Sequence, residues 1–263
     1  PDVSDYFDRT DPDSGQVTKA IKPTAVLCLT HAHEDHIGAL PYVLRTLHVP
    51  VYGTRLTLGI LQKKLSEYHY EQTPELICVN AGDTIEAGVF SIEFIRVNHS
   101  IADACALAIK TPLGTIIHSG DFKLDLTPIE SKMMDITRFG ELGNEGVLLL
   151  MCESTNAERP GFAPSERKVG ATLDDIFMKN KDYRIVIATF SSNVHRVQQI
   201  ISKSAEYGRK VAITGRSMLN IVGVATELEY MTVPDGVLVD INEIKKYPPE
   251  QMTIITTGSQ GEP

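Results

Sequence analysis

Three features that mark other classes of protein are absent or scarce in this sequence. No apolar stretch among its 263 residues is long enough to span a bilayer, and no charged-then-apolar leader is found. We therefore expect a cytoplasmic protein without membrane contact. Only four cysteines occur, and none of them form a CxxC pair, which argues against a disulfide framework and a zinc knuckle. The cysteines are predicted to be buried strand thiols in a reducing compartment: Cys28, Cys78, Cys105 and Cys152.

The third missing feature is an excess of positive charge, which nucleic-acid-binding proteins commonly have. The formal net charge is −9; residues 1–160 contain 13 Lys and Arg against 22 Asp and Glu, whereas residues 161–263 contain 12 of each. The acidic half also contains the candidate metal ligands, so divalent cations would offset part of its charge. A nucleic acid would then be held locally, by a few basic side chains. The candidates, most of which we expect to be ordinary surface residues, are Arg159, Arg167, Lys168, Arg196 and Arg216.

The most informative segment present is His-Ala-His-Glu-Asp-His at residues 31–36, directly after an apolar run at residues 25–29. His31 and His33 are two residues apart, so in an extended loop their side chains lie on one side and can bind the same ion. Asp35 and His36 fall where the apolar spacing predicts the start of a helix, which turns them toward a second point. Imidazole and carboxylate ligands together favour zinc, or manganese at the more oxygen-rich position. The loop therefore predicts ligands for two neighbouring ions, and a histidine-rich surface loop is the alternative.

Two further candidate ligands come directly after predicted strands. Residues 89–98 alternate apolar and polar side chains and end at His99, and the apolar run at residues 115–117 leads through His-Ser-Gly to Asp121. Ligands at the ends of successive strands can converge on one edge of a sheet. Taken singly, each residue could equally be an ordinary turn residue.

The order of these motifs resembles that of the metallo-β-lactamase superfamily of dinuclear metal hydrolases: HxHxDH, then a single histidine, then an aspartate in a Ser-Gly-Asp turn. The resemblance implies two Zn²⁺ ions per complete site, with Mn²⁺ or Mg²⁺ as substitutes, and a water molecule between them that is activated as a nucleophile. It assigns the first ion to His31, His33 and His99, the second to Asp35 and His36, and both to Asp121. The superfamily hydrolyses lactones, thioesters, β-lactams and phosphodiesters, so the metal loop alone does not identify the substrate.

Strands and helices alternate in the second half of the chain. The pattern predicts a helix at residues 165–179, a helix that ends near Tyr207, a helix that begins after Gly215, and strands at residues 184–189, 210–214 and 252–256. Short loops rich in Gly and Ser join them, which is typical of a doubly wound parallel sheet. With 42% hydrophobic residues, the chain can bury a sizeable core. We expect an α/β protein with a partial αββα-type metallo-β-lactamase domain at residues 1–160 and a second partial domain at residues 161–263.

Four motifs in this half resemble the β-CASP branch of the superfamily and, within it, the ribonuclease J family. They are Cys-Glu-Ser-Thr-Asn at residues 152–156, Ala-Thr-Phe-Ser-Ser-Asn-Val-His-Arg at 188–196, Gly-Arg-Ser-Met at 215–218 and Thr-Gly-Ser-Gln-Gly-Glu-Pro at 257–263. The resemblance implies hydrolysis of RNA, both internally and from 5′-monophosphorylated ends, in rRNA maturation and mRNA decay. It also implies a homo-oligomer or a complex with a paralogue. Because family motifs upstream and downstream of these are missing, we expect a fragment that lacks both ends.

The same resemblance assigns roles to individual residues. Glu153 falls where the family has an acidic proton donor, and His195 matches a β-CASP histidine that faces the metal cleft, so these two are the catalytic candidates. For His195, the alternative is a helix N-terminal residue bonded to the preceding turn. Ser192 and Asn193 match a segment that contacts RNA.

Two other segments are candidate phosphate sites. Glycines in residues 258–263 would let backbone N–H groups approach an oxyanion, with Ser259 and Gln260 as further donors. Arg216 and Ser217 begin a predicted helix, and helix N-termini bind phosphates. An ordinary tight turn and a self-capped helix are the respective alternatives. Two different functions also remain open for the chain: a hydrolase of a small ester or thioester, and a non-catalytic RNA-binding subunit of a nuclease complex.

Overall fold

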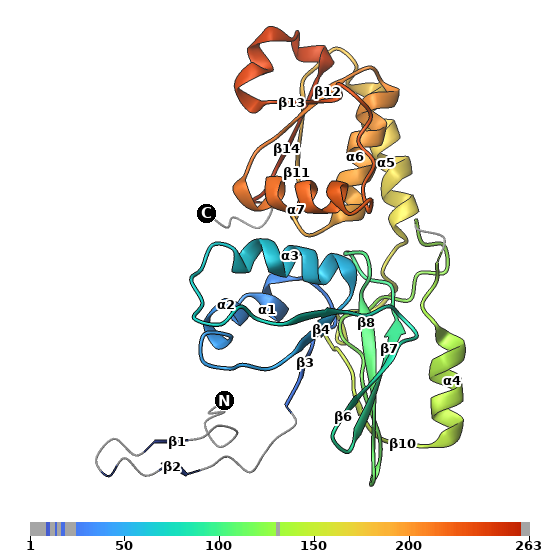
Figure 1. Cartoon of the computed structure of the whole chain (residues 1–263). Coiled ribbons are helices and arrows are strands. Elements are labelled where there is room, and N and C mark those ends of the chain that lie inside the picture. Colours follow the sequence, from blue (N-terminus) through green and yellow to red (C-terminus); the bar gives the residue numbers. More distant parts are fainter. Residues whose placement is uncertain (1–8, 11–13, 15–16, 19–24, 130–131, 259–263) are drawn as a thin grey trace.

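The computed structural model describes residues 9–10, 14, 17–18, 25–129 and 132–258, and the first part of the chain forms two main sheets (Figure 1). One is a parallel sheet of β3 (Leu27–Cys28), β4 (Val51–Gly53) and β5 (Leu76–Cys78). The other has the order β10-β9-β8-β7-β6 and is antiparallel except for the pair β9 and β10. Its strands are β6 (Thr84–Ala87), β7 (Phe90–Arg96), β8 (Cys105–Thr111), β9 (Gly114–His118) and β10 (Val147–Met151). The short strands β1 (Arg9–Thr10) and β2 (Val17–Thr18) pair antiparallel.

Four helices accompany these sheets: α1 (Glu34–Ile37), α2 (Leu40–Val43), α3 (Arg55–Leu65) and α4 (Ile136–Glu145). In α3, Leu58, Leu61 and Leu65 are buried, while Lys63 is exposed. Helix α4 begins after Asp135, whose side chain accepts a hydrogen bond from the Arg138 N–H at 3.0 Å. Together these elements give two sheets accompanied by helices, as expected for the first region of an α/β protein.

The second half forms a four-stranded sheet of order β11-β14-β12-β13 in which every pair is parallel, as predicted. Its strands are β11 (Ile185–Ala188), β12 (Lys210–Ile213), β13 (Leu238–Val239) and β14 (Met252–Thr256). Its helices are α5 (Glu166–Lys179), α6 (Val194–Glu206), α7 (Arg216–Glu227) and the 3-10 helices η2 (Ile241–Lys246) and η3 (Pro249–Gln251). Residues 152–165, all described, contain neither helix nor strand, and a domain boundary near residue 160 remains a prediction.

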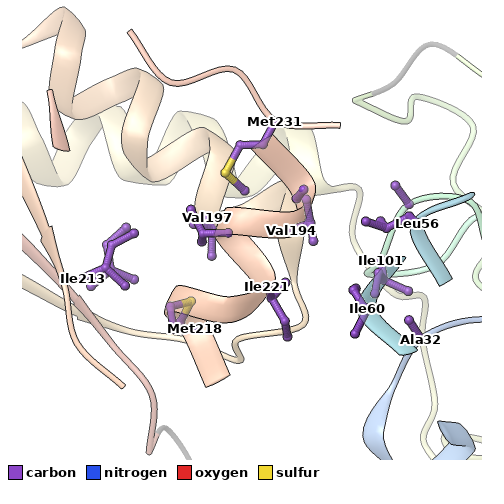
Figure 2. Close-up of a cluster of buried hydrophobic side chains, with 14 of the residues drawn as sticks. Ala32, Leu56, Ile60, Ile101, Val194, Val197, Ile213, Met218, Ile221 and Met231 are labelled. Carbon is purple, nitrogen blue, oxygen red and sulfur yellow. The ribbon is translucent and has the colours of Figure 1, made fainter. Parts of the chain in front are cut away.

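A shared hydrophobic core joins the two regions. Helix α3 of the first region contacts α7 of the second, and Figure 1 shows the two helices facing each other. Leu56 and Ile60 of the first region belong to the same buried cluster as Val194 and Ile221 of the second (Figure 2). The loops beside these helices are therefore held close to one another. Within the described ranges, no helix combines the length and the apolar character that crossing a membrane requires.

The prediction of four buried cysteines was wrong for two of them. Cys105 is buried and Cys28 half-buried, and burial raises the pKa of their thiols to about 12 and about 11. Cys78 and Cys152 are exposed. Cys78 ends β5 and Cys152 comes directly after β10, and both strands lie at the edge of a sheet, where fewer neighbours cover a side chain.

Candidate metal centre and adjoining cavities

The histidine-rich loop is anchored to both sheets of the first region. Leu29 donates its N–H to the Tyr52 carbonyl of β4 at 2.8 Å, and the Thr30 carbonyl accepts the N–H of Cys105 in β8 at 2.8 Å. Helix α1 then begins, and the His33 carbonyl accepts N–H groups of His36 and Ile37, both at 3.0 Å. His33 is therefore in extended backbone, and the next two candidate ligands lie on a helical turn, as the spacing predicted.

Four predicted ligands form one cluster. The ligand atoms of His31, His33, His99 and Asp121 all lie within 4.8 Å of one another. His99 Nε2 is 3.0 Å from His33 Nδ1, and Asp121 Oδ2 is 3.8 Å from His99 Nε2 and 3.9 Å from His31 Nε2. With metal–nitrogen bonds of about 2.0–2.1 Å, two nitrogens of a tetrahedral zinc site are roughly 3.3 Å apart. The donor atoms therefore fit a single zinc-sized ion.

The remaining two predicted ligands form a second cluster that shares Asp121 with the first. His36 Nε2 is 3.5 Å from Asp35 Oδ2 and 3.5 Å from Asp121 Oδ1. Asp121 thus directs Oδ2 toward the first cluster and Oδ1 toward the second. A carboxylate in this position can bridge two cations.

Hydroxyl groups lie on the other ring nitrogens of these histidines. Thr30 Oγ1 is 3.1 Å from His31 Nδ1 and 3.4 Å from His36 Nδ1, and Ser100 Oγ is 3.3 Å from His33 Nε2. Such partners fix the ring orientation and leave the opposite nitrogen for an ion. His31 Nε2 is buried and has no hydrogen-bond partner within the described residues. A buried polar atom without a partner is costly, and an ion at the cluster removes that cost.

The histidines of the first cluster are neutral near pH 7. Burial, followed by repulsion from His36, lowers the pKa of His31 to about 2, and burial, followed by repulsion from His33, lowers the pKa of His99 to about 3. Burial is also the largest cause that lowers the pKa of His33. Because a neutral imidazole has a free lone pair, these side chains can bind a metal without first losing a proton.

The turn before Asp121 requires glycine. Gly120 has φ of +56°, and a Cβ at this position would lie 2.9 Å from the Cys105 carbonyl oxygen and 3.0 Å from Thr30 Cβ. Its N–H donates to His118 Nδ1 at 3.1 Å. The Ser-Gly-Asp turn thus brings the end of β9 against the histidine-rich loop, which sets the position of the bridging carboxylate.

The two catalytic candidates lie near this centre in different ways. Parallel pairing of β10 with β9 brings Glu153 beside the Asp121 turn, where its N–H donates to Ser119 Oγ at 3.0 Å. The Glu153 carboxylate accepts the Thr155 N–H at 2.8 Å and belongs to neither cluster among the described residues. His195, the second residue of α6, lines a small cavity of about 20 Å³ together with the metal-ligand candidate His99.

A buried charge network crosses between the two regions beside that cavity. Glu166 of α5 accepts hydrogen bonds from the Arg196 guanidinium at 2.9 Å and 3.2 Å, and the Lys123 ammonium lies 3.4 Å from Glu166 and 3.8 Å from Asp125. Arg196, a candidate RNA contact in the sequence, is therefore engaged within the protein. Sequence reasoning missed the network because its members are far apart in the chain and no local pattern pairs them.

A larger cavity of about 470 Å³ opens beside the metal loop. Ala32 and Glu34 of the loop line it, and so do three of the predicted RNA contacts: Ser192, Arg216 and Ser217. Glu34 is held by the Lys64 ammonium at 2.5 Å and 2.7 Å, and Ser217 Oγ is 3.0 Å from Ser191 Oγ. The structure thus brings these three residues together next to the candidate metal centre.

The other predicted RNA contacts are placed differently. Asn193 is buried, and its Oδ1 accepts the Arg196 N–H at 3.1 Å, so its side chain caps helix α6. Ser259 and Gln260 lie outside the described residues. Contacts of RNA with these three residues remain predictions.

Comparison with known proteins supports both halves of this description. A family model described as the metallo-beta-lactamase superfamily matches residues 15–131, and one described as the ribonuclease J beta-CASP domain matches residues 182–263. Ribonuclease J of Mycobacterium tuberculosis is 44% identical over 253 residues, which are 96% of this chain and 45% of that protein. Ribonuclease J of Helicobacter pylori is 42% identical over 252 residues, which are 95% of this chain and 36% of that protein.

Ribonuclease J2 of Bacillus subtilis is 40% identical over 263 residues, which are the whole of this chain and 45% of that protein. The chain therefore spans between 36% and 45% of the length of these three relatives. A crystal structure of a protein of unknown function from Enterococcus faecalis matches with a TM-score of 0.66 and 23% identity. That match covers 94% of this chain and 61% of the other, and it supports the fold alone.

Proposed function

We propose, from the premise that this chain is a ribonuclease J homologue joining a metallo-β-lactamase region to a β-CASP region, that it acts as a metal-dependent ribonuclease. The observation that carries the proposal is the geometry of Asp121. Its two carboxylate oxygens face two different groups of ligand atoms, 3.5 Å from His36 on one side and 3.8 Å from His99 on the other. A dinuclear site of this kind suits the hydrolysis of phosphodiesters.

The proposed ions are two divalent cations. We propose that His31, His33 and His99 hold a zinc ion at the nitrogen-rich cluster, and that Asp35 and His36 hold zinc or manganese at the other. When bound, the cations lower the pKa of a shared water molecule and offset the charge of a phosphate group. The neutral histidines, the hydroxyls of Thr30 and Ser100 and the bridging Asp121 keep the donor atoms in place.

The protein's own groups would do the rest of the chemistry. We assign Glu153 as the group that protonates the leaving oxygen, because it lies two residues after β10 and its N–H donates to Ser119, beside the Asp121 turn. We assign His195 to the reacting phosphate, because it lines a cavity with His99. The hydroxyls of Ser192 and Ser217 and the Arg216 guanidinium would bind RNA in the cavity beside the metal loop. Asn193, Ser259 and Gln260 are proposed as further contacts.

The substrate we propose is RNA with a 5′-monophosphate, cleaved both internally and from its 5′ end. In that role the protein would serve rRNA maturation and mRNA decay in the cytoplasm, as a homo-oligomer or in a complex with a paralogue. These statements rest on homology with ribonuclease J.

The test is RNA cleavage by the intact protein, with 5′-monophosphorylated RNA and Zn²⁺ or Mn²⁺. We expect cleavage that is lost on chelation and on Asp35→Ala, because this carboxylate is one of three groups in the second cluster. Asp174→Ala is the matched control, since Asp174 lies on α5 and forms a surface ion pair with Lys203.

Each result separates the proposal from its alternatives. An inactive wild-type protein without stoichiometric metal would favour the non-catalytic RNA-binding subunit. Hydrolysis of small esters or thioesters without RNA cleavage would favour the other metallohydrolase. RNA cleavage that survives Asp35→Ala would contradict the second metal site.

A further inference from the structure

A further polar cavity lies next to the segment that contains His99. It has a volume of about 490 Å³, which is in the range of small-molecule sites. Residues 79–81 after β5, residues 96–98 at the end of β7, residues 103–105 at the start of β8 and Tyr230 after α7 form its walls. Asn98 lines both this cavity and the small one beside His99. None of the residues so far assigned to RNA or metals lines it.

Three cationic side chains line this cavity: Arg55, Arg96 and Lys132. None of their charged groups makes a hydrogen bond or ion pair with another residue in the part of the chain that the structure describes. Asp103 is the one carboxylate among the described lining residues, so three cations and one anion leave the cavity with two unbalanced positive charges, in a chain of net charge −9. The cavity beside the metal loop differs, because Glu34 there neutralises Lys64.

The single carboxylate of the cavity is already engaged. Asp103 accepts a hydrogen bond from the Tyr230 hydroxyl, and its backbone, with φ of +62°, is held by Thr54 Oγ1, which donates to the Asp103 carbonyl at 3.0 Å. The hydrogen bond from the Tyr230 hydroxyl ties the Asp103 carboxylate to the second region. The cations therefore face a space in which an anionic ligand would supply the missing charge.

The size and lining of the cavity indicate what kind of anion fits. A phosphate ion alone would fill a small part of 490 Å³. The remaining wall includes Tyr230, which is half-buried and whose ring can pack against a base. A phosphate monoester carries about −1.5 to −2 charges near neutral pH, which three cations can balance.

We propose that this cavity is a second nucleotide site, which binds the phosphate of a nucleoside 5′-monophosphate through Arg55, Arg96 and Lys132 and stacks its base on Tyr230. The choice of ligand rests on the proposed function, since hydrolysis from a 5′ end releases nucleoside 5′-monophosphates. The 5′ end of an RNA chain presents the same chemistry, and the two sources differ only in whether further nucleotides are attached to the 3′ side of the first nucleoside.

The test is calorimetric binding of adenosine 5′-monophosphate to the intact protein after metal removal with EDTA, so that metals cannot hold the phosphate. We expect Arg96→Gln to weaken binding roughly ten- to a hundredfold, as expected for the loss of one charged hydrogen bond to a phosphate. Arg55→Gln should weaken it as well, and because Arg55 is exposed this change leaves the fold intact. Lys179→Gln, the same charge change at an exposed position of α5, should have no effect.

Further measurements assign the source of the phosphate and separate this inference from the proposed ribonuclease activity. Adenosine without phosphate should not bind. A 5′-monophosphorylated RNA oligomer that displaces the mononucleotide would identify the chain end as a ligand of the same site, whereas no displacement would identify the free nucleotide. No binding, or equal binding by the wild type and both arginine variants, would overturn the second site even if RNA cleavage is observed. Binding without any cleavage would leave the site intact and contradict the proposed function.

Discussion

Individual side chains determine how closely the two candidate metal sites are linked. Asp121 is the only residue that belongs to both clusters among the described residues, and each of its oxygens faces a different one. The grouping of the loop ligands could be predicted from the sequence, because HxHxDH places donors on an extended segment and a helical turn in succession. The assignment of His99 and Asp121 came from the resemblance to the superfamily. The hydroxyls of Thr30 and Ser100 could not, because a serine or threonine next to a ligand has no distinctive pattern.

We expect Asp121→Asn to lower the metal content from two ions toward one and RNA cleavage by at least about a hundredfold. The amide keeps the shape of the side chain but removes the negative charge that both cations share. Elemental analysis of the dialysed protein and a cleavage assay measure the two effects. Asp135→Asn, at the cap of α4, is the matched control and should retain both ions. Two bound ions in Asp121→Asn would contradict a bridging role.

The buried histidines also predict how the stability of the metal-free protein depends on pH. The folded-state pKa values of His31, about 2, and His99, about 3, lie below the usual 6.5, so the unfolded chain binds more protons at any pH between these values. The free energy of unfolding should therefore fall as pH decreases from about 6.5 to about 3, by at most about 1.4 kcal/mol per pH unit for each histidine.

Urea unfolding of the EDTA-treated protein at a series of pH values measures this slope. His31→Gln should make it shallower, because glutamine does not titrate. His69→Gln is the control, since His69 is exposed. Equal slopes for the wild type and His31→Gln would show that His31 does not contribute.

At the scale of helices and strands, the sequence was most informative where a pattern is long. Helix α5 begins and ends within a residue of its prediction because Ser165 caps it and accepts the Arg167 N–H at 3.3 Å. The predicted strand at residues 252–256 is β14 in full. Strand β13, with two residues, and the 3-10 helices η2 and η3 were not predicted, because segments this short carry no periodicity.

Arg209 shows how one side chain can join several elements of the second region. Its side chain is 3% exposed and donates to four backbone carbonyls, those of Asn180, Lys181, Tyr183 and Met252, at 2.9 to 3.3 Å. We expect Arg209→Leu to lower the free energy of unfolding by roughly 3 kcal/mol, because these carbonyls lose their donor in a buried site. The free energy of unfolding of Arg209→Lys should lie between those of the wild type and Arg209→Leu, since a lysine ammonium cannot reproduce the planar arrangement of donors in the guanidinium.

Urea unfolding measures the loss in both variants. Lys203→Met is the control, because Lys203 forms ion pairs at the surface of α6 with Glu206 and Asp174, and such pairs contribute at most about 1 kcal/mol. A loss for Arg209→Leu no larger than that of the control would contradict its structural role.

For the whole molecule, the interface between the two regions is the feature that the sequence did not reveal. The sequence predicted two regions, but not that α3 would lie on α7 or that Glu166 would meet Lys123 and Asp125. These contacts join residues more than forty positions apart, such as Lys123 and Glu166. They depend on how the folded sheets of the two regions are placed relative to each other, which no local sequence pattern determines. The cavity beside the metal loop is built from both regions, so its shape depends on this interface.

Gly59 offers a test of that dependence, because it lies where α3 meets α7. A Cβ there would be 2.6 Å from Leu228 Cδ1 and 3.1 Å from Val224 Cγ1, so a larger side chain must displace these two side chains at the interface. We expect Gly59→Val to lower the free energy of unfolding by about 1–3 kcal/mol and to reduce RNA cleavage, while both metal ions stay bound. Gly223→Val is the matched control, since a Cβ on this residue of α7 has no atom within 4 Å. If Gly59→Val is destabilised but cleaves RNA as well as the control does, the interface stabilises the fold and does not shape the proposed RNA site. If Gly59→Val also loses metal, the interface affects the metal centre as well as the cavity.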